Sequence, residues 1–290
     1  METLKSGFGL LEAPIWDENR GLLFADADNG GVHCLDQQGN VSTIVKYRKG
    51  IGGAVRHRNG GLVVSGRNVA YKDISDSPTV VLLDKNPPQG VVGFNDITTD
   101  SKGRIYAGAL GFLPTETPLS GIGGDRKSAP LFLIDTDGSA RVVHPSVALS
   151  NGLGFSPDGS LLYHADSGNR HLYIYDVASD GGVANRRLFA TVPEGLPDGL
   201  AISEDGCIWL AVAHAGKVIR FSPGGSKRSE IEFPVPMVTS LCFGGSDRRD
   251  LYVVSGSEGT GKTNAGAIFR LKTDVPGTIV TPAAVRIGPS

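Results

Sequence analysis

The stretch Pro157–Tyr163 (PDGSLLY) carries the pattern that decides the fold of this 290-residue chain. A polar turn containing Asp and Gly leads directly into an apolar run, which indicates a turn followed by a buried strand. The pattern recurs five times, at Glu18–Phe24 (ENRGLLF), Arg58–Val64 (RNGGLVV), Ser101–Ala107 (SKGRIYA), Glu204–Leu210 (EDGCIWL) and Asp247–Val253 (DRRDLYV). The chain therefore contains six copies of one repeat.

The spacing of the six apolar runs predicts the architecture. They begin at residues 22, 62, 105, 161, 208 and 251, and further short runs follow each one, as in Val32–Asp36 and Val41–Val45. About 45 residues with three to four short strands is the period of a propeller blade. We therefore predict an all-β, six-bladed β-propeller of four-stranded antiparallel blades, a single domain over residues 1–290. Its N- and C-terminal strands, at Leu4–Leu11 and Thr278–Ile287, should pair to close the ring.

Composition and charge exclude several classes of protein. The 41 Gly residues lack the period of collagen and disfavour a helical bundle, where each interior Gly costs roughly 1 kcal/mol. With 28 basic and 30 acidic residues, the net charge of −2 gives no attraction for nucleic acid. The sequence has no apolar run of membrane-spanning length, and its start lacks a signal-peptide layout. We expect a cytoplasmic monomer or small homo-oligomer without a membrane partner.

The third interval between repeats is longer than the others, which points to an insertion at residues 110–130. This segment contains Gly111–Pro114 and Gly121–Gly124 and has no strand pattern. A long loop in a compact domain is often a lid or a binding loop. The alternative is a plain surface insertion, and the sequence favours neither.

One register in the repeat is rich in oxygen donors. Ten residues before the six apolar runs stand Glu12, Gly52, Asn95, Asn151, Asp198 and Leu241. Equivalent positions of propeller blades line one ring, so we expect the four polar side chains to converge. Carboxylate and carboxamide oxygens suit Ca²⁺, Mg²⁺ or Mn²⁺, whereas Zn²⁺ usually takes His or Cys but is not excluded. The alternative is that these residues only cap turns beside Gly, which does not explain their shared register.

Several stretches resemble the family of gluconolactonase, senescence marker protein 30 (regucalcin) and luciferin-regenerating enzyme. They are Glu12–Trp16 (EAPIW), Phe94–Asp96 (FND), Ser150–Gly159 (SNGLGFSPDG) and Pro197–Ala201 (PDGLA). The resemblance spans about residues 8 to 270 and implies a six-bladed propeller with one divalent cation in its channel. It assigns Glu12, Asn151 and Asp198 as metal ligands, with calcium favoured. It also implies that Asn95 contacts the substrate, or the metal through a water molecule, and that Asp198 is the catalytic base.

The sequence departs from the sugar-lactone members of this family at two positions. The pattern of those members is Arg-x-Asn-Asp where this chain has Gly93–Asp96 (GFND). Those members also have an acidic residue further along the sequence, at a position that falls here near Leu113. Loss of both polar groups lowers the cost of binding apolar ligands and removes selection for hydroxyls. We therefore expect Phe94, Asn95 and Leu113 to bind a lactone or ester less polar than gluconolactone.

The activity that follows is metal-dependent hydrolysis of a lactone ring. The cation would polarise the carbonyl and activate water, Asp198 would accept the proton, and Asn95 would orient substrate or water. Two alternatives remain. A fluorophosphatase or phosphotriesterase of similar design would use Asp198 as a nucleophile, and a noncatalytic regulatory propeller would bind metal without turnover.

Two other signals have ordinary explanations. Gly256–Thr263 (GSEGTGKT) matches the P-loop pattern, but a P-loop must open a helix and the residues after it, Asn264–Leu271, have a strand pattern. We predict a hairpin loop and no nucleotide site. His164 and His171 flank a turn in the fourth repeat, and ordinary hydrogen bonds at the channel rim are their expected role.

Overall fold

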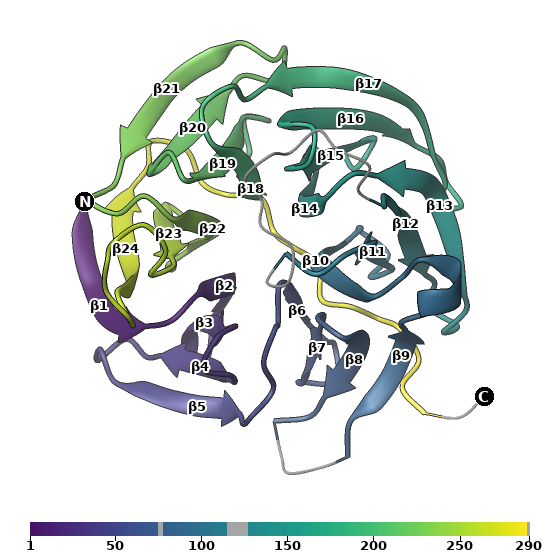
Figure 1. The fold of residues 1–290 in the computed structure, drawn as a ribbon, viewed down its shortest axis with the longest axis horizontal. Coiled ribbons are helices and arrows are strands. Elements are labelled where there is room, and N and C mark those ends of the chain that lie inside the picture. The colour runs from purple at the N-terminus through teal and green to yellow at the C-terminus, as the bar shows by residue number, and fades with distance from the viewer. Residues whose placement is uncertain (75–77, 115–126, 289–290) are drawn as a thin grey trace. The chain divides into compact units, whose positions relative to one another are not determined.

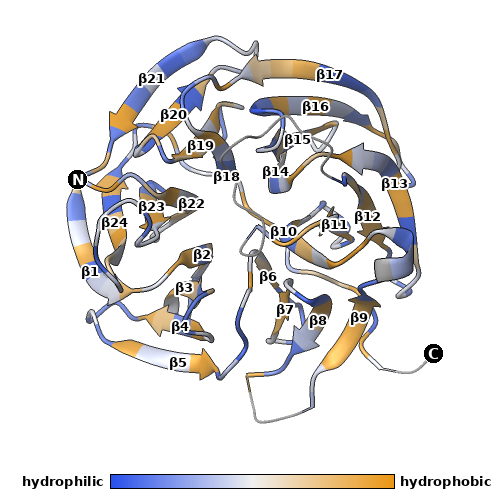
Figure 2. Cartoon of the chain, viewed as in Figure 1, coloured by the Kyte–Doolittle hydropathy of each residue, from blue (hydrophilic) through white to orange (hydrophobic). Residues whose placement is uncertain are grey.

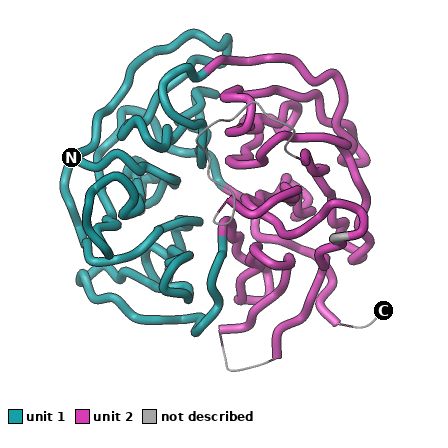
Figure 3. Tube along the Cα trace, viewed as in Figure 1, with its two compact units in different colours: residues 1–51, 192–279 teal, residues 52–191, 280–290 magenta. Residues whose placement is uncertain are grey.

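The structure is a computed structural model that describes residues 1–74, 78–114 and 127–288 (Figure 1). Within those residues the chain forms six four-stranded antiparallel sheets, and each sheet is one blade. The predicted all-β, six-bladed propeller is therefore confirmed. The chain divides into two compact units of three blades each (Figure 3): unit 1 is Met1–Ile51 with Val192–Ile279, and unit 2 is Gly52–Thr191 with Val280–Ser290. The single-domain organisation stays a prediction.

Unit 1 contains the first blade of the chain and the last two. The first blade has β2 (Leu11–Asp17), β3 (Gly21–Asp26), β4 (Val32–Leu35) and β5 (Val41–Val45). The next has β18 (Leu196–Ile202), β19 (Ile208–Ala213), β20 (Lys217–Phe221) and β21 (Lys227–Glu232). The last has β22 (Val238–Gly244), β23 (Asp250–Ser255), β24 (Gly266–Lys272) and β1 (Glu2–Phe8).

Unit 2 contains the three blades between them. They are β6 (Ala54–Arg56), β7 (Leu62–Val64), β8 (Asn68–Lys72) and β9 (Val80–Asp84); β10 (Gly93–Thr99), β11 (Ile105–Leu110), β12 (Ala129–Ile134) and β13 (Ala140–Val147); and β14 (Ser150–Phe155), β15 (Leu161–Asp166), β16 (His171–Val177) and β17 (Val183–Thr191). A 3₁₀ turn, η1 (Pro87–Gln89), connects the first two.

Burial follows strand order within each blade. The second strands, which are the apolar runs of the repeat, are buried almost throughout, as in β3, β11 and β19. The fourth strands are mostly exposed, as in β17 and β21, which carry hydrophilic stretches (Figure 2). The core therefore lies between the faces of successive inner strands, because that is where the apolar residues of each repeat gather.

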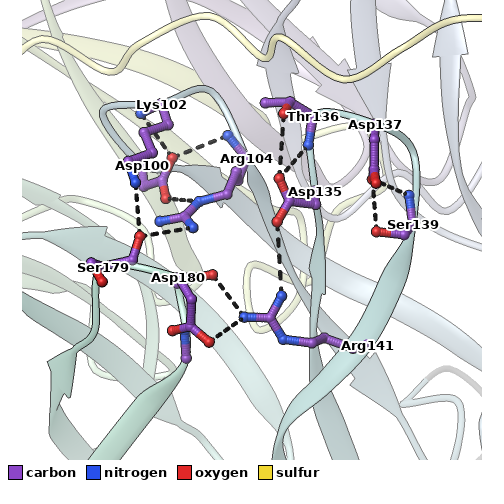
Figure 4. A network of polar contacts seen from close by, with 12 residues as sticks. Asp100, Lys102, Arg104, Asp135, Thr136, Asp137, Ser139, Arg141, Ser179 and Asp180 are labelled. Carbon is purple, nitrogen blue, oxygen red and sulfur yellow. Dashed lines mark hydrogen bonds and ion pairs between the residues drawn. The ribbon is translucent and has the colours of Figure 1, made fainter.

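The turns that carry the repeat are fixed by side chains. In the turn before β15, Gly159 has φ 72°, a left-handed conformation that favours glycine, and the Asp158 carboxylate accepts the Ser160 N–H at 3.0 Å. In the turn before β11, the Asp100 carboxylate accepts the Arg104 N–H and pairs with its guanidinium at 2.6 Å (Figure 4). These contacts explain why the repeat is visible in the sequence as polar turns.

The predicted closure of the ring by pairing of N- and C-terminal strands is confirmed, but the C-terminal strand is β24 and not Thr278–Ile287. β1 pairs antiparallel with β24 from Glu2 opposite Arg270 to Phe8 opposite Gly266. The prediction that Thr278–Ile287 would supply this strand is wrong. That segment contains Pro282, which has no N–H for a sheet ladder.

The C-terminal segment binds instead along the turns of other blades. In unit 2, Ala283 donates to the Arg56 carbonyl, Ala284 donates to the Gly103 carbonyl, and the His57 ring bonds to the Val285 carbonyl at 2.9 Å. Ala283 and Val285 are buried in the core of this unit. The segment therefore contributes apolar contacts as well as hydrogen bonds.

We predict that Val285→Ala destabilises the protein by about 1–3 kcal/mol, because it removes buried methyl groups and leaves a cavity. Val280→Ala, on the same segment but 52% exposed, is the matched control and should change stability little. Urea unfolding of the two variants tests this. Equal midpoints for both variants would show that the segment is not part of the core.

Candidate functional site

The four predicted site residues share one local structure. In each of their strands the pairing with the second strand is interrupted, between Glu12 and Ile15, Phe94 and Ile97, Ser150 and Leu153, and Pro197 and Leu200. Each interruption places two consecutive residues opposite one, as in a β-bulge, which turns side chains away from the regular pleat. Glu12, Asn95, Asn151 and Asp198 each lie at or within such a bulge.

The two nonpolar positions of the same register differ in structure as well. β6 begins only at Ala54, so Gly52 precedes its ladder. Leu241 pairs regularly with Val253 and is buried in the core of unit 1. The bulge of its strand lies earlier, between Val238 and Ser240.

In unit 1 the bulges hold the two carboxylates. Glu12 is half-buried, and Ala13 after it has φ 52°, so the chain turns sharply there. The Thr239 hydroxyl donates to the Leu11 carbonyl and fixes β2 just before Glu12. Asp198 is only 6% exposed.

The bulge at Asp198 needs a glycine after it. A Cβ on Gly199 would lie 2.2 Å from the Ser240 Oγ, so β18 and β22 approach each other too closely for a side chain. This close approach explains the Asp-Gly pair at residues 198–199 of the sequence.

In unit 2 the bulges hold the two carboxamides, and hydrogen bonds orient both. Asn95 Nδ2 donates to the Ser150 carbonyl at 2.9 Å, and Asn151 Nδ2 donates to Ser167 Oγ at 3.2 Å. A carbonyl oxygen can only accept, so the Ser150 contact assigns the Asn95 nitrogen and leaves the Asn95 Oδ1 pointing elsewhere. A Cβ on Gly52 would lie 2.1 Å from the Asn95 Oδ1, which explains the glycine at this register.

The structure thus joins Asn95 and Asn151 through Ser150 within unit 2. Glu12 and Asp198 lie in unit 1, on β2 and β18, and both strands contact β22. The assembly of all four residues into one site stays a prediction.

A buried serine–histidine pair lies beside the carboxamides. Ser150 Oγ and His164 Nε2 are 2.7 Å apart, and both residues are fully buried. His164 does make the expected hydrogen bond, but it lies in the core and not at a rim. Burial, with lesser contributions from His144 and Arg186, lowers its pKa to about 3, so the ring is neutral at physiological pH. Its pairing could not be read from the sequence, because Ser150 is 14 residues away.

Asp96 is a second residue that the sequence analysis did not assign. It is half-buried beside Asn95, and its Oδ1 accepts the Ile97 N–H at 2.8 Å. The Leu153 N–H also bonds to it. Burial raises its pKa to about 7 despite these two donors, a value suited to proton transfer near neutral pH. Its adjacency to Asn95 in the FND stretch was the available signal.

The predicted substrate-binding residues lie in different surroundings. The Phe94 side chain is 1% exposed and packs against Phe132 in the core of unit 2. Leu113 is half-buried, and its Cδ2 would lie 3.6 Å from a Cβ on Gly93. The two departures from the sugar-lactone pattern are therefore neighbours in space. Residues 115–126 of the predicted insertion lie outside the described residues.

A scan of family models matches residues 10–257 to the SMP-30/gluconolactonase/LRE-like region. The chain belongs to this family. A 6-deoxy-6-sulfogluconolactonase of Pseudomonas putida is 34% identical over 278 residues, 92% of each chain. A pentonolactonase of Haloferax volcanii is 31% identical over 297 residues, 96% of this chain and 95% of its own. A calcium-binding protein, regucalcin, of Agrobacterium tumefaciens shares the fold, with a TM-score of 0.80, 18% identity and coverage of 98% and 97%.

The P-loop-like stretch, metal-binding groups and membrane-spanning helices are the remaining features to compare with the structure. Gly256–Thr263 lies in the connection between β23 and β24, and the element after it is a strand, so the predicted hairpin loop is confirmed. Among the described residues, three or more His, Cys, Asp or Glu side chains nowhere gather into a metal-binding group, and the predicted ligand set of Glu12, Asn151 and Asp198, with two carboxylates and one carboxamide, is not of that type. No helix within the described ranges could cross a membrane.

The buried His164 predicts a pH dependence of stability. Its pKa is about 3 when folded and about 6.5 when unfolded, so unfolding takes up a proton between these values. Its stabilising contribution is complete above pH 6.5 and is lost as the pH falls. His164→Gln cannot take up this proton. Between pH 6 and 4 its free energy of unfolding should therefore fall less steeply than that of the wild type, by roughly 1.4 kcal/mol per pH unit. Urea unfolding across this range measures both slopes, and parallel slopes would contradict the prediction.

Proposed function

We propose that this protein is a divalent-metal-dependent lactonase, a hydrolase that opens a lactone ring. The observation that supports it best is the occurrence of Glu12, Asn95, Asn151 and Asp198 at one register, each at a bulge of a first strand. Membership of a family whose relatives are named as sugar lactonases supports the same reaction. Neither register nor bulge is needed for a residue that only caps a turn.

We propose that Glu12, Asn151 and Asp198 hold the cation. The donor set is two carboxylates and one carboxamide oxygen, all hard ligands, which suits Ca²⁺ first and also Mg²⁺ or Mn²⁺, with Zn²⁺ less favoured. The hydrogen bond from Asn151 Nδ2 to Ser167 fits this role, since it leaves the carbonyl oxygen as the group available to a cation. Calcium sites commonly combine carboxylates with Asn carbonyl oxygens.

The protein side chains then have separate tasks. A divalent cation at such a site supplies charge that stabilises the oxyanion of ester hydrolysis and makes nearby water more acidic. Asp198 accepts a proton from the attacking water. Asn95 holds its carboxamide in one orientation through Ser150 and orients substrate or water with its Oδ1.

We propose a substrate less polar than gluconolactone. At the positions of Gly93 and Leu113, the pattern of the family's sugar lactonases has an Arg and an acidic residue. Gly93 and Leu113 offer no hydrogen bonds from side chains. In a site without partners for hydroxyl groups, the desolvation of a polyol weakens its binding, whereas burial of an apolar chain strengthens binding. Alkyl-substituted lactones and related esters are the expected class.

Asp198→Asn tests the central role of this carboxylate. The change keeps the shape of the side chain and removes the charge and the base, so lactone turnover should fall by about 10²–10⁴-fold. The variant should also bind Ca²⁺ more weakly in calorimetric titration. Asp17→Asn, a buried carboxylate at the far end of β2 that pairs with Arg20, is the control and should keep its turnover.

Four results would contradict the proposal. Undiminished turnover of Asp198→Asn would exclude this residue as base and ligand. Turnover that survives a chelator would exclude the cation. Hydrolysis of phosphotriesters in preference to every lactone would favour the phosphotriesterase alternative, and tight cation binding without any turnover would favour a regulatory propeller.

The double variant Gly93→Arg with Leu113→Glu tests the substrate class. It introduces the charged pair found in the pattern of the family's sugar lactonases, at two positions that are neighbours in space. We expect the ratio of kcat/KM for gluconolactone to kcat/KM for an alkyl lactone to rise by about tenfold or more. Steady-state assays on both substrates measure this ratio. An unchanged ratio would show that these positions do not select the substrate.

A further inference from the structure

We infer that the buried Ser150–His164 pair is a positioning device for the carboxamides of Asn95 and Asn151. The inference rests on the proposed function for its effect on turnover, but not for its effect on structure. Neither His164 nor the Ser150 side chain is assigned to bind substrate or cation. Both act through the residues they hold.

The hydrogen bond of this pair spans the bulge that carries Asn151. In the ladder between β14 and β15, Ser150 lies opposite Asp166, and the next regular pair is Leu153 opposite His164. Asn151 and Gly152 lie between these pairs without a regular partner. The His164 ring reaches back across this interval to Ser150 Oγ, at 2.7 Å. The hydrogen bond therefore joins Ser150, at the start of the bulge, to His164, which pairs with Leu153 at the end of the bulge.

The same serine also holds the neighbouring blade. Its carbonyl accepts Asn95 Nδ2 from β10 at 2.9 Å. A Cβ on Gly108 of β11 would lie only 1.8 Å from Ser150 Oγ, so the hydroxyl fills the space that this glycine leaves. Movement of Ser150 would therefore displace the Asn95 partner and the main chain of Asn151 together.

His164 is exceptional at its position in the repeat. Three residues after the start of the apolar runs of the other five repeats stand Ala25, Ser65, Gly108, Ala211 and Val254. An imidazole replaces these small or aliphatic residues in one blade only. Ser65 shows that a polar group here can hold the chain at the start of a first strand, because its Oγ accepts the N–H of Gly53, just before β6, at 2.7 Å.

The surroundings of His164 give it no other polar task. The ring is fully buried near Tyr175, and its Nδ1 has no hydrogen-bond partner among the described residues. A buried polar atom without a partner is costly, and a purely structural position would favour an apolar residue. The bond to Ser150 is what distinguishes His164 from an apolar side chain here.

Variants that break the pair from three directions test the inference. His164→Phe keeps a buried ring without a hydrogen-bonding group, and Ser150→Ala removes the hydroxyl. Gly108→Ala introduces a methyl group where the hydroxyl lies. His164→Gln restores a group that can bond to Ser150. We expect the first three to lower kcat/KM by about 10–100-fold, mainly in kcat, and to weaken Ca²⁺ binding by chelator-treated protein in calorimetry. His164→Gln should recover most of both.

Two matched variants control for lost stability. His57→Phe removes another buried histidine of unit 2, which bonds to Val285 and contacts Tyr71. Gly224→Ala adds a methyl group whose nearest neighbour would be 3.9 Å away. Both should keep the wild-type kcat/KM and Ca²⁺ affinity per folded molecule.

A crystal structure of His164→Phe decides the positioning role without reference to activity. We expect Asn95 Nδ2 to leave the Ser150 carbonyl or to occupy two positions. An Asn95–Ser150 contact unchanged in this variant would overturn the inference, as would wild-type kcat/KM and Ca²⁺ affinity in both His164→Phe and Ser150→Ala. A wild-type protein that neither hydrolyses lactones nor binds Ca²⁺ would instead overturn the proposed function, and the crystal structure would still decide the positioning role.

Discussion

The interrupted pairing between the first and second strands of a blade is the constraint on which the candidate site depends. A regular antiparallel ladder would alternate side chains between two faces of a packed blade. The bulges at Glu12, Asn95, Asn151 and Asp198 remove two residues from that alternation and allow a polar side chain at a strand that is otherwise buried. Each bulge interrupts the ladder between two strands, and each has a contact of its own that secures the chain there.

Those contacts are different in each bulge. Thr239 secures the main chain before Glu12, and the close packing of Gly199 on Ser240 secures the chain after Asp198. In unit 2, Ser150 and His164 tie the bulge of Asn151, while Gly52 leaves room for the Asn95 oxygen. A repeat can therefore preserve one register while each blade supports it with its own residues.

The parts of the fold that repeat could be predicted from the sequence. Turns such as that at Asp158 and Gly159 fix local geometry through near neighbours, so their residues recur and mark the blades. The register of Glu12 and Asp198 followed from the same turns. Contacts between residues far apart in sequence were not predictable. The C-terminal segment lies beside His57, where Ala283 and Val285 are buried in the core of unit 2, and not beside β1.

The central claim is that Glu12, Asn151 and Asp198 bind one divalent cation. Anomalous diffraction from crystals soaked in Mn²⁺ tests it most directly, because the signal locates the ion without reference to activity. We predict one strong peak within about 2.0–2.6 Å of oxygen atoms of all three residues, and no such peak in crystals of Asp198→Asn. A peak elsewhere, or none beside these residues at saturating Mn²⁺, would contradict it.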